Sequence, residues 1–359
     1  MRHVVFVLLA AVCFGTTGTA QALGPDGASA LSVGAARILL GGAALALVAW
    51  LVRRRTAGFD LFSPRSLSVP RRERQRPHRN PSVAPGGFDT AATPVESLRG
   101  QPQARSRAIM PRHPRAVPTW LVIAVGALGV VAYQPAFFLG TGLNGVAIGT
   151  IVALGSAPII TGALEWLIAR RFPGLVWLVA TAVATAGVVL LSGVGGSAAV
   201  SIPGLLASLG AGASYAVYAL ASKRLLVRGW APTASMGAIF GWAAVVSLPI
   251  LLTTDLAWLV TAAGAGMTLW LGLVTTTLAY LLFARGLSGL TAATVSTLTL
   301  AEPLTASLLG VLLLGERLPG SAILGLMVLA LGLVILILPR RVGSGGPTRL
   351  ERMLRHLRR

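Results

Sequence analysis

The sequence is almost free of the side chains that build disulfides, phosphate-binding loops and zinc sites. It has one cysteine, Cys13, so no intrachain disulfide can form. Its single lysine, Lys223, does not complete a Gly-x-x-x-x-Gly-Lys-[Ser/Thr] motif, which excludes a nucleotide-binding loop of that type. The four histidines lie outside the middle of every apolar segment, which argues against a buried zinc ion or a histidine-based catalytic centre. We therefore expect neither a metal nor a cofactor.

Charged residues are scarce as well. They make up 11% of the chain, whereas hydrophobic residues make up 55%, and the mean hydropathy is +0.78. A soluble domain needs more polar surface than this, but a helical membrane protein does not. Apolar runs of about 20 residues, each long enough to cross ~30 Å of hydrocarbon, recur along the chain. They predict an all-α polytopic membrane protein with ten transmembrane helices, at 4–22, 30–52, 119–140, 145–169, 174–193, 203–222, 233–253, 263–284, 289–314 and 321–339.

The second half of the chain repeats motifs of the first half. Residues 8–17 match residues 205–214, and shorter motifs match further along. These shorter matches pair Tyr133 with Tyr280, and Pro158 with Pro303. Each copy has five spans, an odd number, so the second copy must enter the membrane upside down relative to the first. The sequence thus predicts two inverted five-helix repeats, the first formed by 1–52 and 119–193 and the second by 194–339.

The first apolar segment has an alternative interpretation as a signal peptide. Arg2-His3 precedes the apolar stretch, and Ala20-Gln21-Ala22 has the composition of a cleavage site. The same segment, however, matches residues 205–220, which lie in the middle of the chain. We therefore interpret it as the first membrane span.

Basic residues near the ends of the spans predict the orientation of the chain. Such residues stay in the cytoplasm, so the connections that carry them face inward. With both termini inside (N-in, C-in), the outer connections carry only Arg317. The inner connections then carry Arg53–Arg55, Arg170, Arg171, Lys223, Arg224, Arg228, Arg285 and the arginines of the tail.

Two polar segments interrupt or follow the spans. Residues 53–118 are rich in Arg, Pro, Ser and Gly, and cannot bury enough apolar surface to offset chain entropy. We expect a disordered basic cytoplasmic loop, either a solvated linker near anionic lipid headgroups or a partner-binding segment. Nucleic-acid binding is disfavoured, because the segment lacks a fold element and interleaved aromatics. Residues 340–359 combine a capping box with leucines at helical spacing and arginines between them, which predicts a basic amphipathic cytoplasmic tail.

Three charged residues fall within the apolar segments, where an unpaired charge costs ~2.5–3.5 kcal/mol at mid-bilayer. Glu302 precedes Pro303, and proline frees a backbone carbonyl beside the carboxylate. Glu302 is thus either a proton or cation site, a clamp for a substrate amine, or a structural carboxylate. Arg37 either binds a substrate carboxylate or pairs with a glutamate. Glu165 lies near the inner end of its span, where its carboxylate can reach water.

Polar side chains form matching stripes on two spans. Thr17 and Gln21 are four residues apart, as are Ser214 and Tyr218, so each pair shares a helix face. These stripes either join helices or line a cavity. Small residues such as Gly15, Gly210 and Gly212 favour close helix packing instead. We predict a substrate cavity from Thr17, Gln21, Arg37, Tyr133, Pro158, Ser214, Tyr218, Tyr280 and Pro303, with Glu302 as the ion-coupling residue.

Several motifs resemble those of the EamA-type family within the drug/metabolite transporter superfamily. They are Phe14-Gly15-Thr16-Thr17-Gly18, Ala36-Arg37, Ala157-Pro158-Ile159-Ile160-Thr161, and Ala301-Glu302-Pro303 followed by Leu314-Gly315-Glu316-Arg317-Leu318. The resemblance implies a ten-helix, two-repeat carrier of the bacterial inner membrane, a family that often exports amino acids, metabolites or drugs. It also implies a central cavity between spans one, three, four, six, eight and nine. The chain departs from the pattern in its long 53–118 insertion.

We therefore expect a secondary transporter that works by alternating access and exports a small molecule. One alternative is a non-transporting membrane scaffold whose basic loop recruits a partner. A membrane enzyme, such as a lipid-headgroup transferase, would need a clustered His, Asp or Lys centre, which the sequence does not offer. The expected partners are a small-molecule substrate, anionic lipids near the basic loop and tail, and a second copy in a homodimer, but no nucleic acid.

Overall fold

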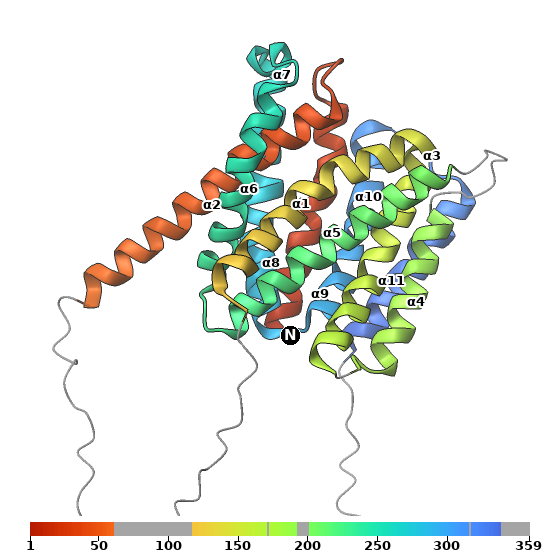
Figure 1. The fold of residues 1–359 in the computed structure, drawn as a ribbon. Helices are drawn as coiled ribbons and strands as arrows, with labels where there is room; N and C mark the ends of the chain where they lie inside the picture. Colours follow the sequence, from red (N-terminus) through yellow and green to blue (C-terminus); the bar gives the residue numbers. More distant parts are fainter. Residues whose placement is uncertain (61–116, 171, 192–200, 316, 339–359) are drawn as a thin grey trace, which may run out of the picture. The chain divides into compact units, whose positions relative to one another are not determined.

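A computed structural model describes residues 1–60, 117–170, 172–191, 201–315 and 317–338 (Figure 1). All regular elements in these ranges are helical. The α-helices are α1 (Arg2–Ala22), α2 (Ala30–Asp60), α3 (Thr119–Ala169), α4 (Leu175–Leu191), α5 (Ile202–Val227), α6 (Pro232–Leu252), α7 (Ala262–Leu269), α8 (Ala279–Gly289), α9 (Ala292–Leu298), α10 (Glu302–Leu314) and α11 (Gly320–Ile337). Three short elements join them, the 3-10 helices η1 (Ala257–Val260) and η3 (Thr299–Ala301) and the π-helix η2 (Trp270–Leu278).

Nine helical segments of the described residues are long and apolar enough to cross a membrane. Two of them are the halves of α3, and two others are the continuous helices α7–η2–α8 and α9–η3–α10. The remaining apolar helix, α4, has 17 residues, about the shortest length that spans a bilayer. The prediction of an all-helical polytopic membrane protein is confirmed. The count of ten spans stays a prediction, because it depends on α4.

Local sequence signals explain where several helices begin and end. Ser201, Thr261 and Thr291 precede α5, α7 and α9, and each side-chain oxygen accepts a hydrogen bond from the backbone N–H three residues later. These bonds satisfy N–H groups that a helix leaves unpaired in its first turn. The α9–η3–α10 helix ends at Gly315, which has a φ of 69°, a left-handed conformation that glycine adopts without strain.

Helix α3 contains the turn between two crossings. Gly145 interrupts its helical backbone with φ 78° and ψ 156°, at the first residue of the predicted span 145–169. The neighbouring Asn144 fastens this turn to the start of α5. Its Oδ1 accepts from the Ser201 backbone N–H at 2.7 Å, and its Nδ2 donates to the Ser201 carbonyl at 3.1 Å. The two hydrogen bonds of this side-chain amide therefore hold the turn against the beginning of α5.

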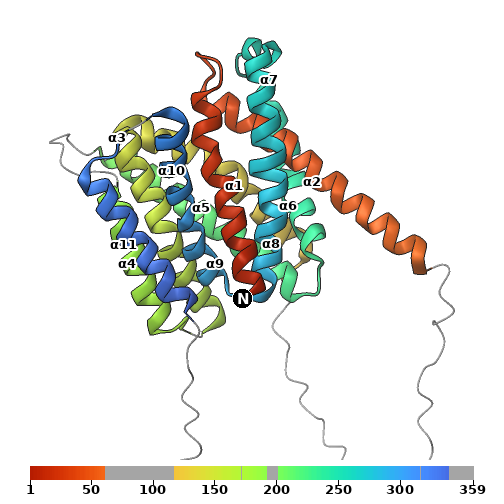
Figure 2. The ribbon, with the colours of Figure 1, turned by 180° about the vertical axis from the view of Figure 1, so that it is seen from behind.

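Helices α4 and α11 lie side by side and run in opposite directions (Figures 1 and 2). Gly187 of α4 lies against the backbone of Leu329, whereas Gly325 of α11 lies against that of Leu191. A side chain at either glycine would clash with the other helix. Small residues thus allow the two backbones to approach closely, as is common between helices in membranes.

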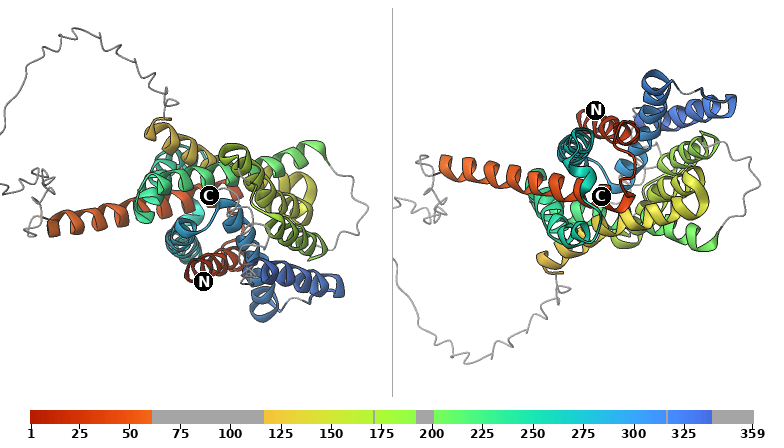
Figure 3. Two further views of the ribbon diagram at one scale, coloured as in Figure 1. Left: turned by 90° about the horizontal axis from the view of Figure 1, so that it is seen from below. Right: turned by 90° about the horizontal axis from the view of Figure 1, so that it is seen from above.

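Helix α1 lies between the α7–η2–α8 helix and α10 (Figure 3). Gly286 of α8 meets Val7, and Gly15 meets Thr305 and the Glu302 carbonyl of α10. Helix α5 makes a corresponding pair of contacts with the two halves of α3. Gly129 meets the Ser214 carbonyl in the first half, and Gly212 meets Ser156 in the second.

Residues 1–55 and the described residues from Val117 onward pack as one compact unit. Helix α2 continues past the predicted end of the second span at 52, and the guanidinium of Arg54 lies 3.7 Å from the centre of the Trp50 ring. The rest of the predicted loop, 61–116, and the predicted amphipathic tail, 340–359, lie outside the described residues. The same holds for Arg171 and Glu316.

Candidate functional site

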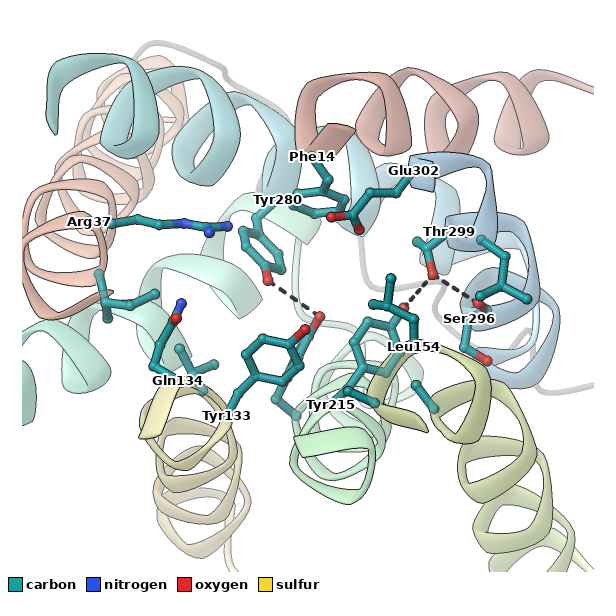
Figure 4. A pocket seen from close by; sticks show the side chains of 16 residues that line it. Phe14, Arg37, Tyr133, Gln134, Leu154, Tyr215, Tyr280, Ser296, Thr299 and Glu302 are labelled. Atoms are coloured by element: carbon teal, nitrogen blue, oxygen red, sulfur yellow. Dashed lines mark hydrogen bonds between the residues drawn. The ribbon is translucent and has the colours of Figure 1, made fainter. Parts of the chain in front are cut away.

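Polar side chains from many helices meet in an interior cavity of about 80 Å³ (Figure 4). A single water needs about 10–15 Å³ of such space, so the cavity has room for roughly five to eight water molecules. This is also the size of a solute with a similar number of non-hydrogen atoms. The lining residues are Phe14, Arg37, Ile38, Val130, Tyr133, Gln134, Ala153, Leu154, Ala157, Tyr215, Tyr218, Tyr280, Ser296, Thr299, Leu300 and Glu302.

Arg37 and Glu302 extend into this cavity from opposite sides, with Tyr280 between them (Figure 4). Arg37 comes from α2 and Glu302 is the first residue of α10. Among the described residues, no carboxylate oxygen lies within 4.0 Å of the Arg37 guanidinium nitrogens. The predicted pairing of Arg37 with a glutamate is therefore not formed in this conformation. A space separates the two opposite charges.

The guanidinium of Arg37 is held by a threonine of the π-helix. Its Nε donates to Thr276 Oγ1 at 3.1 Å, and the Thr276 hydroxyl in turn donates to the Leu271 carbonyl at 2.9 Å. Leu271 lies five residues before Thr276, the spacing of a π-helix. Because the Thr276 hydroxyl donates its one proton to this carbonyl, its oxygen is free to accept the hydrogen bond from Arg37. π-Helical turns are frequent at functional sites, and here one fixes the direction of a charged side chain.

All four tyrosines of the chain line the cavity. The Tyr280 hydroxyl donates to that of Tyr218 at 3.3 Å, and Tyr215 shares a 3.0 Å hydrogen bond with Thr299. Edge-to-face ring contacts add to these bonds, with centroids 5.0 Å apart for Tyr215 and Tyr218. The walls between the two charges are therefore aromatic faces that carry hydroxyl groups, which suits a solute with both apolar and polar groups.

The cavity brings together five of the residues predicted from the sequence and leaves out five. Arg37, Tyr133, Tyr218, Tyr280 and Glu302 line it. The residues that are not part of its lining are Thr17, Gln21, Pro158, Ser214 and Pro303. For the two prolines the preceding residue lines the cavity instead, Ala157 in α3 and Glu302 in α10.

Several lining residues were missed by sequence reasoning, although a signal for some of them exists. Ser296, Thr299 and Glu302 are spaced three residues apart, which places them on one side of the α9–η3–α10 helix. Tyr215 is likewise three residues before Tyr218. Gln134 has no such signal, because its neighbour Tyr133 lines the cavity too and a regular helix face does not select both.

Glu165 lies outside the cavity and caps a helix. Its two carboxylate oxygens accept from the backbone N–H groups of Ala292, at 3.2 Å, and Ala293, at 2.8 Å. These N–H groups belong to the first turn of α9, where a negative charge is favourable. Lys223 also binds this connection, because its Nζ donates to the carbonyls of Leu287 and Leu290. The α8–α9 turn is thus held by a carboxylate from α3 and an ammonium from α5.

The described residues contain no group of three His, Cys, Asp or Glu side chains that could together hold a metal ion.

Comparison with known proteins identifies the family. Residues 202–338 match the model of the EamA-like transporter family. The "Uncharacterized transporter YwfM" of Bacillus subtilis (strain 168) is 36% identical over 331 residues, which cover 92% of each chain. The chain belongs to the EamA-like transporter family. It is a membrane transporter rather than an enzyme, which confirms the family predicted from the motifs.

One further relative and one solved structure are also similar to this chain. Protein PecM of Dickeya dadantii (strain 3937) is 30% identical over 225 residues, which cover 60% of this chain and 73% of PecM. A solved crystal structure covers 98% of this chain and 98% of its own, with a TM-score of 0.64 at 18% identity. At that identity the likeness concerns the fold alone.

Proposed function

We propose that this EamA transporter carries a small zwitterion, such as an amino acid, by alternating access across the bacterial inner membrane. The observation behind the proposal is the position of Arg37 and Glu302 on opposite sides of one small cavity. A solute with a carboxylate and an ammonium group could bind both residues at once. Each residue would then supply the counter-charge that the solute needs inside the membrane.

The packing of α1 and α5 supports two inverted repeats. The match of 8–17 with 205–214 pairs Gly15 with Gly212, and the proline match pairs Glu302 with Ala157. Gly15 meets the Glu302 carbonyl, and Gly212 meets the Ala157 backbone nitrogen. Equivalent glycines therefore meet equivalent points of the partner helices. Rocking of one repeat against the other around the cavity would open it to alternate sides of the membrane.

Glu302 is our candidate for the ion-coupling residue. It is the only carboxylate among the described residues that line the cavity, and the repeat match places Ala157 at the corresponding point of the other half. A single carboxylate can bind the substrate ammonium and a proton or cation in turn, so that release of the substrate is exchanged for uptake of the ion. The sequence has no phosphate-binding loop of the Walker type, so a gradient or exchange would supply the energy. We propose export as the direction.

The substrate proposal is tested by ligand-induced thermal stabilisation of the purified protein. The probes are neutral α-amino acids, each paired with its decarboxylated amine and with its deaminated carboxylic acid. We expect at least one amino acid to raise the unfolding temperature while its two partners do not. Arg37→Gln should abolish the effect. Glu302→Gln should weaken it without abolishing it, because the glutamine oxygen still accepts a hydrogen bond from the substrate ammonium. Arg285→Gln, which removes a charge outside the cavity, should keep it. Equal stabilisation by the amine or the acid alone would contradict the proposal.

The coupling proposal is tested by flux in proteoliposomes with an amino acid found in that screen. Glu302→Gln should still exchange labelled for unlabelled substrate but lose its response to an imposed proton or sodium gradient. Gradient-driven accumulation that stays at the wild-type level would remove Glu302 from the coupling role.

A further inference from the structure

Two of the apolar grooves on the surface of the helical unit lie along the C-terminal halves of α1 and α5. One, of about 460 Å³, is lined by the outer half of α1, the start of the α7–η2–α8 helix and the end of α10. The other, of about 250 Å³, is lined by the C-terminal half of α5, the start of α3 and the end of its second half. We call them the outer and inner groove, after the sides to which the basic residues assign them.

The two grooves use the same positions of the predicted repeats. The sequence match that aligns 8–17 with 205–214, and the one that aligns Pro158 with Pro303, together predict four pairs of equivalent lining residues. These pairs are Ala20 with Val217, Leu23 with Leu220, Leu309 with Leu164, and Leu313 with Ile168. Each groove is thus formed where the first helix of one repeat meets the third and fourth helices of the other.

The grooves differ in charge. The inner groove ends at Arg224, in the last turn of α5, and its side chain is exposed. Within the described residues no hydrogen bond or ion pair engages the Arg224 guanidinium. The repeat match places Gly27 at the corresponding position of the outer groove, and the described lining of that groove includes no basic residue. Of these two grooves, only the inner one therefore has a cation in its described lining. It lies on the side where anionic lipids attract basic residues.

The inner groove itself is apolar and open to its surroundings. Val125 is 42% and Ile168 is 61% exposed, and both line it. In a membrane such side chains face acyl chains rather than water. The groove thus combines an apolar channel along the helices with a guanidinium at the level where the helices end.

We propose that the inner groove is a binding site for an anionic phospholipid, with one acyl chain in the groove and the headgroup phosphate on Arg224. Arginine binds phosphate by parallel hydrogen bonds in addition to charge. In an anionic phospholipid no headgroup cation competes with Arg224 for the phosphate, so such a lipid should bind better than a zwitterionic one. The lipid would lie against both repeats at once, because Leu220 belongs to one and Leu164 to the other.

The test is lipid binding to the purified, delipidated full chain, measured by native mass spectrometry. The probes are dioleoyl-phosphatidylglycerol and dioleoyl-phosphatidylcholine, which share acyl chains and differ in net charge. We expect wild-type protein to prefer phosphatidylglycerol, and Arg224→Gln to weaken its binding about fivefold, the weight of one basic residue near an anionic surface. Arg285→Gln, which removes a cation outside the groove, is the matched control and should keep the preference.

A second pair of variants tests the acyl-chain position. Val125→Trp fills the groove and should lower the binding of both lipids, whereas Val245→Trp, at an exposed position of α6 outside the groove, should not. If Val125→Trp does not yield folded protein, Ile168→Trp places the same ring in the groove. Unchanged phosphatidylglycerol binding in Arg224→Gln, unchanged binding in the groove-filling variant, or equal losses in the controls would each overturn the proposal. The measurement involves no transport, so its outcome is separate from that of the proposed function.

Discussion

The Nε of Arg37 donates a hydrogen bond to the hydroxyl of Thr276, across the contact between α2 and the π-helix η2. Arg37 would otherwise be a long, flexible cation beside a cavity. Gly41 of α2 lies directly against the Thr276 side chain, so the two helices are close enough at this point for the bond to form. The π-helix thereby determines where the positive side of the cavity lies.

The first prediction concerns this hydrogen bond. Thr276→Val keeps the shape of the side chain but removes its acceptor, and a hydrogen bond to a charged group contributes ~1.5–3 kcal/mol. We expect affinity for a carboxylate-bearing substrate to fall about tenfold or more, with a smaller change in the maximal transport rate. Thr275→Val is the matched control, because the Thr275 hydroxyl donates only to the Leu271 carbonyl. Equal effects of both variants on affinity would show that Thr276 does not position Arg37.

The second prediction concerns helix packing. Gly187→Ala places a methyl group against the Leu329 backbone and should lower the unfolding temperature in detergent. Gly18→Ala is the control, because a methyl group there meets no atom within 4 Å. In a helix interior, alanine is more favourable than glycine by ~1 kcal/mol, so Gly18→Ala should be neutral or stabilising. A tolerated Gly187→Ala would contradict the close α4–α11 contact.

The third prediction concerns the cap that Glu165 provides. Glu165→Ala removes the acceptor of two N–H groups of α9, and loss of a helix cap costs ~0.5–2 kcal/mol. We expect a lower unfolding temperature without a change in substrate selectivity, since Glu165 does not line the cavity. Glu165→Gln keeps one acceptor oxygen and should lose less. Altered selectivity in both variants would assign Glu165 to the transport site.

The fourth prediction separates transport from the scaffold alternative. Deletion of residues 57–114 removes most of the basic segment and none of the cavity lining. Flux in proteoliposomes should remain near the wild-type rate. Loss of flux by a deleted protein that still folds would show that the segment takes part in transport.

The sequence predicts the membrane class because its long apolar runs are typical of membrane spans. It also predicts the charged residues of the site, because a charge inside an apolar span is costly and therefore needs a functional or structural role. Arg37 and Glu302 stand out in this way, and both line the cavity. Tyr133 and Tyr280 recur at matching positions of the two halves, which predicts that both line the cavity.

The remaining features depend on geometry that periodicity does not describe. The π-helix changes the register of α7–η2–α8, so a regular 3.6-residue pattern does not predict that Thr276 faces Arg37. Gln21 shares a sequence stripe with Thr17, yet its side chain is exposed near the end of α1 rather than directed into the cavity. The spacing of four residues predicts which face of the helix is polar. It does not predict how far along the helix the cavity extends.

Alternating access is tested most directly by labelling a cavity residue from both sides of the membrane. Cys13→Ser provides a cysteine-free protein, and Ala157→Cys then places one thiol in the cavity wall. A membrane-impermeant maleimide should label it both in right-side-out and in inside-out vesicles, whereas Ala243→Cys, fully buried between helices, should stay unlabelled in both. Labelling of Ala157→Cys from one side only, in a protein that still transports, would contradict the alternating cavity.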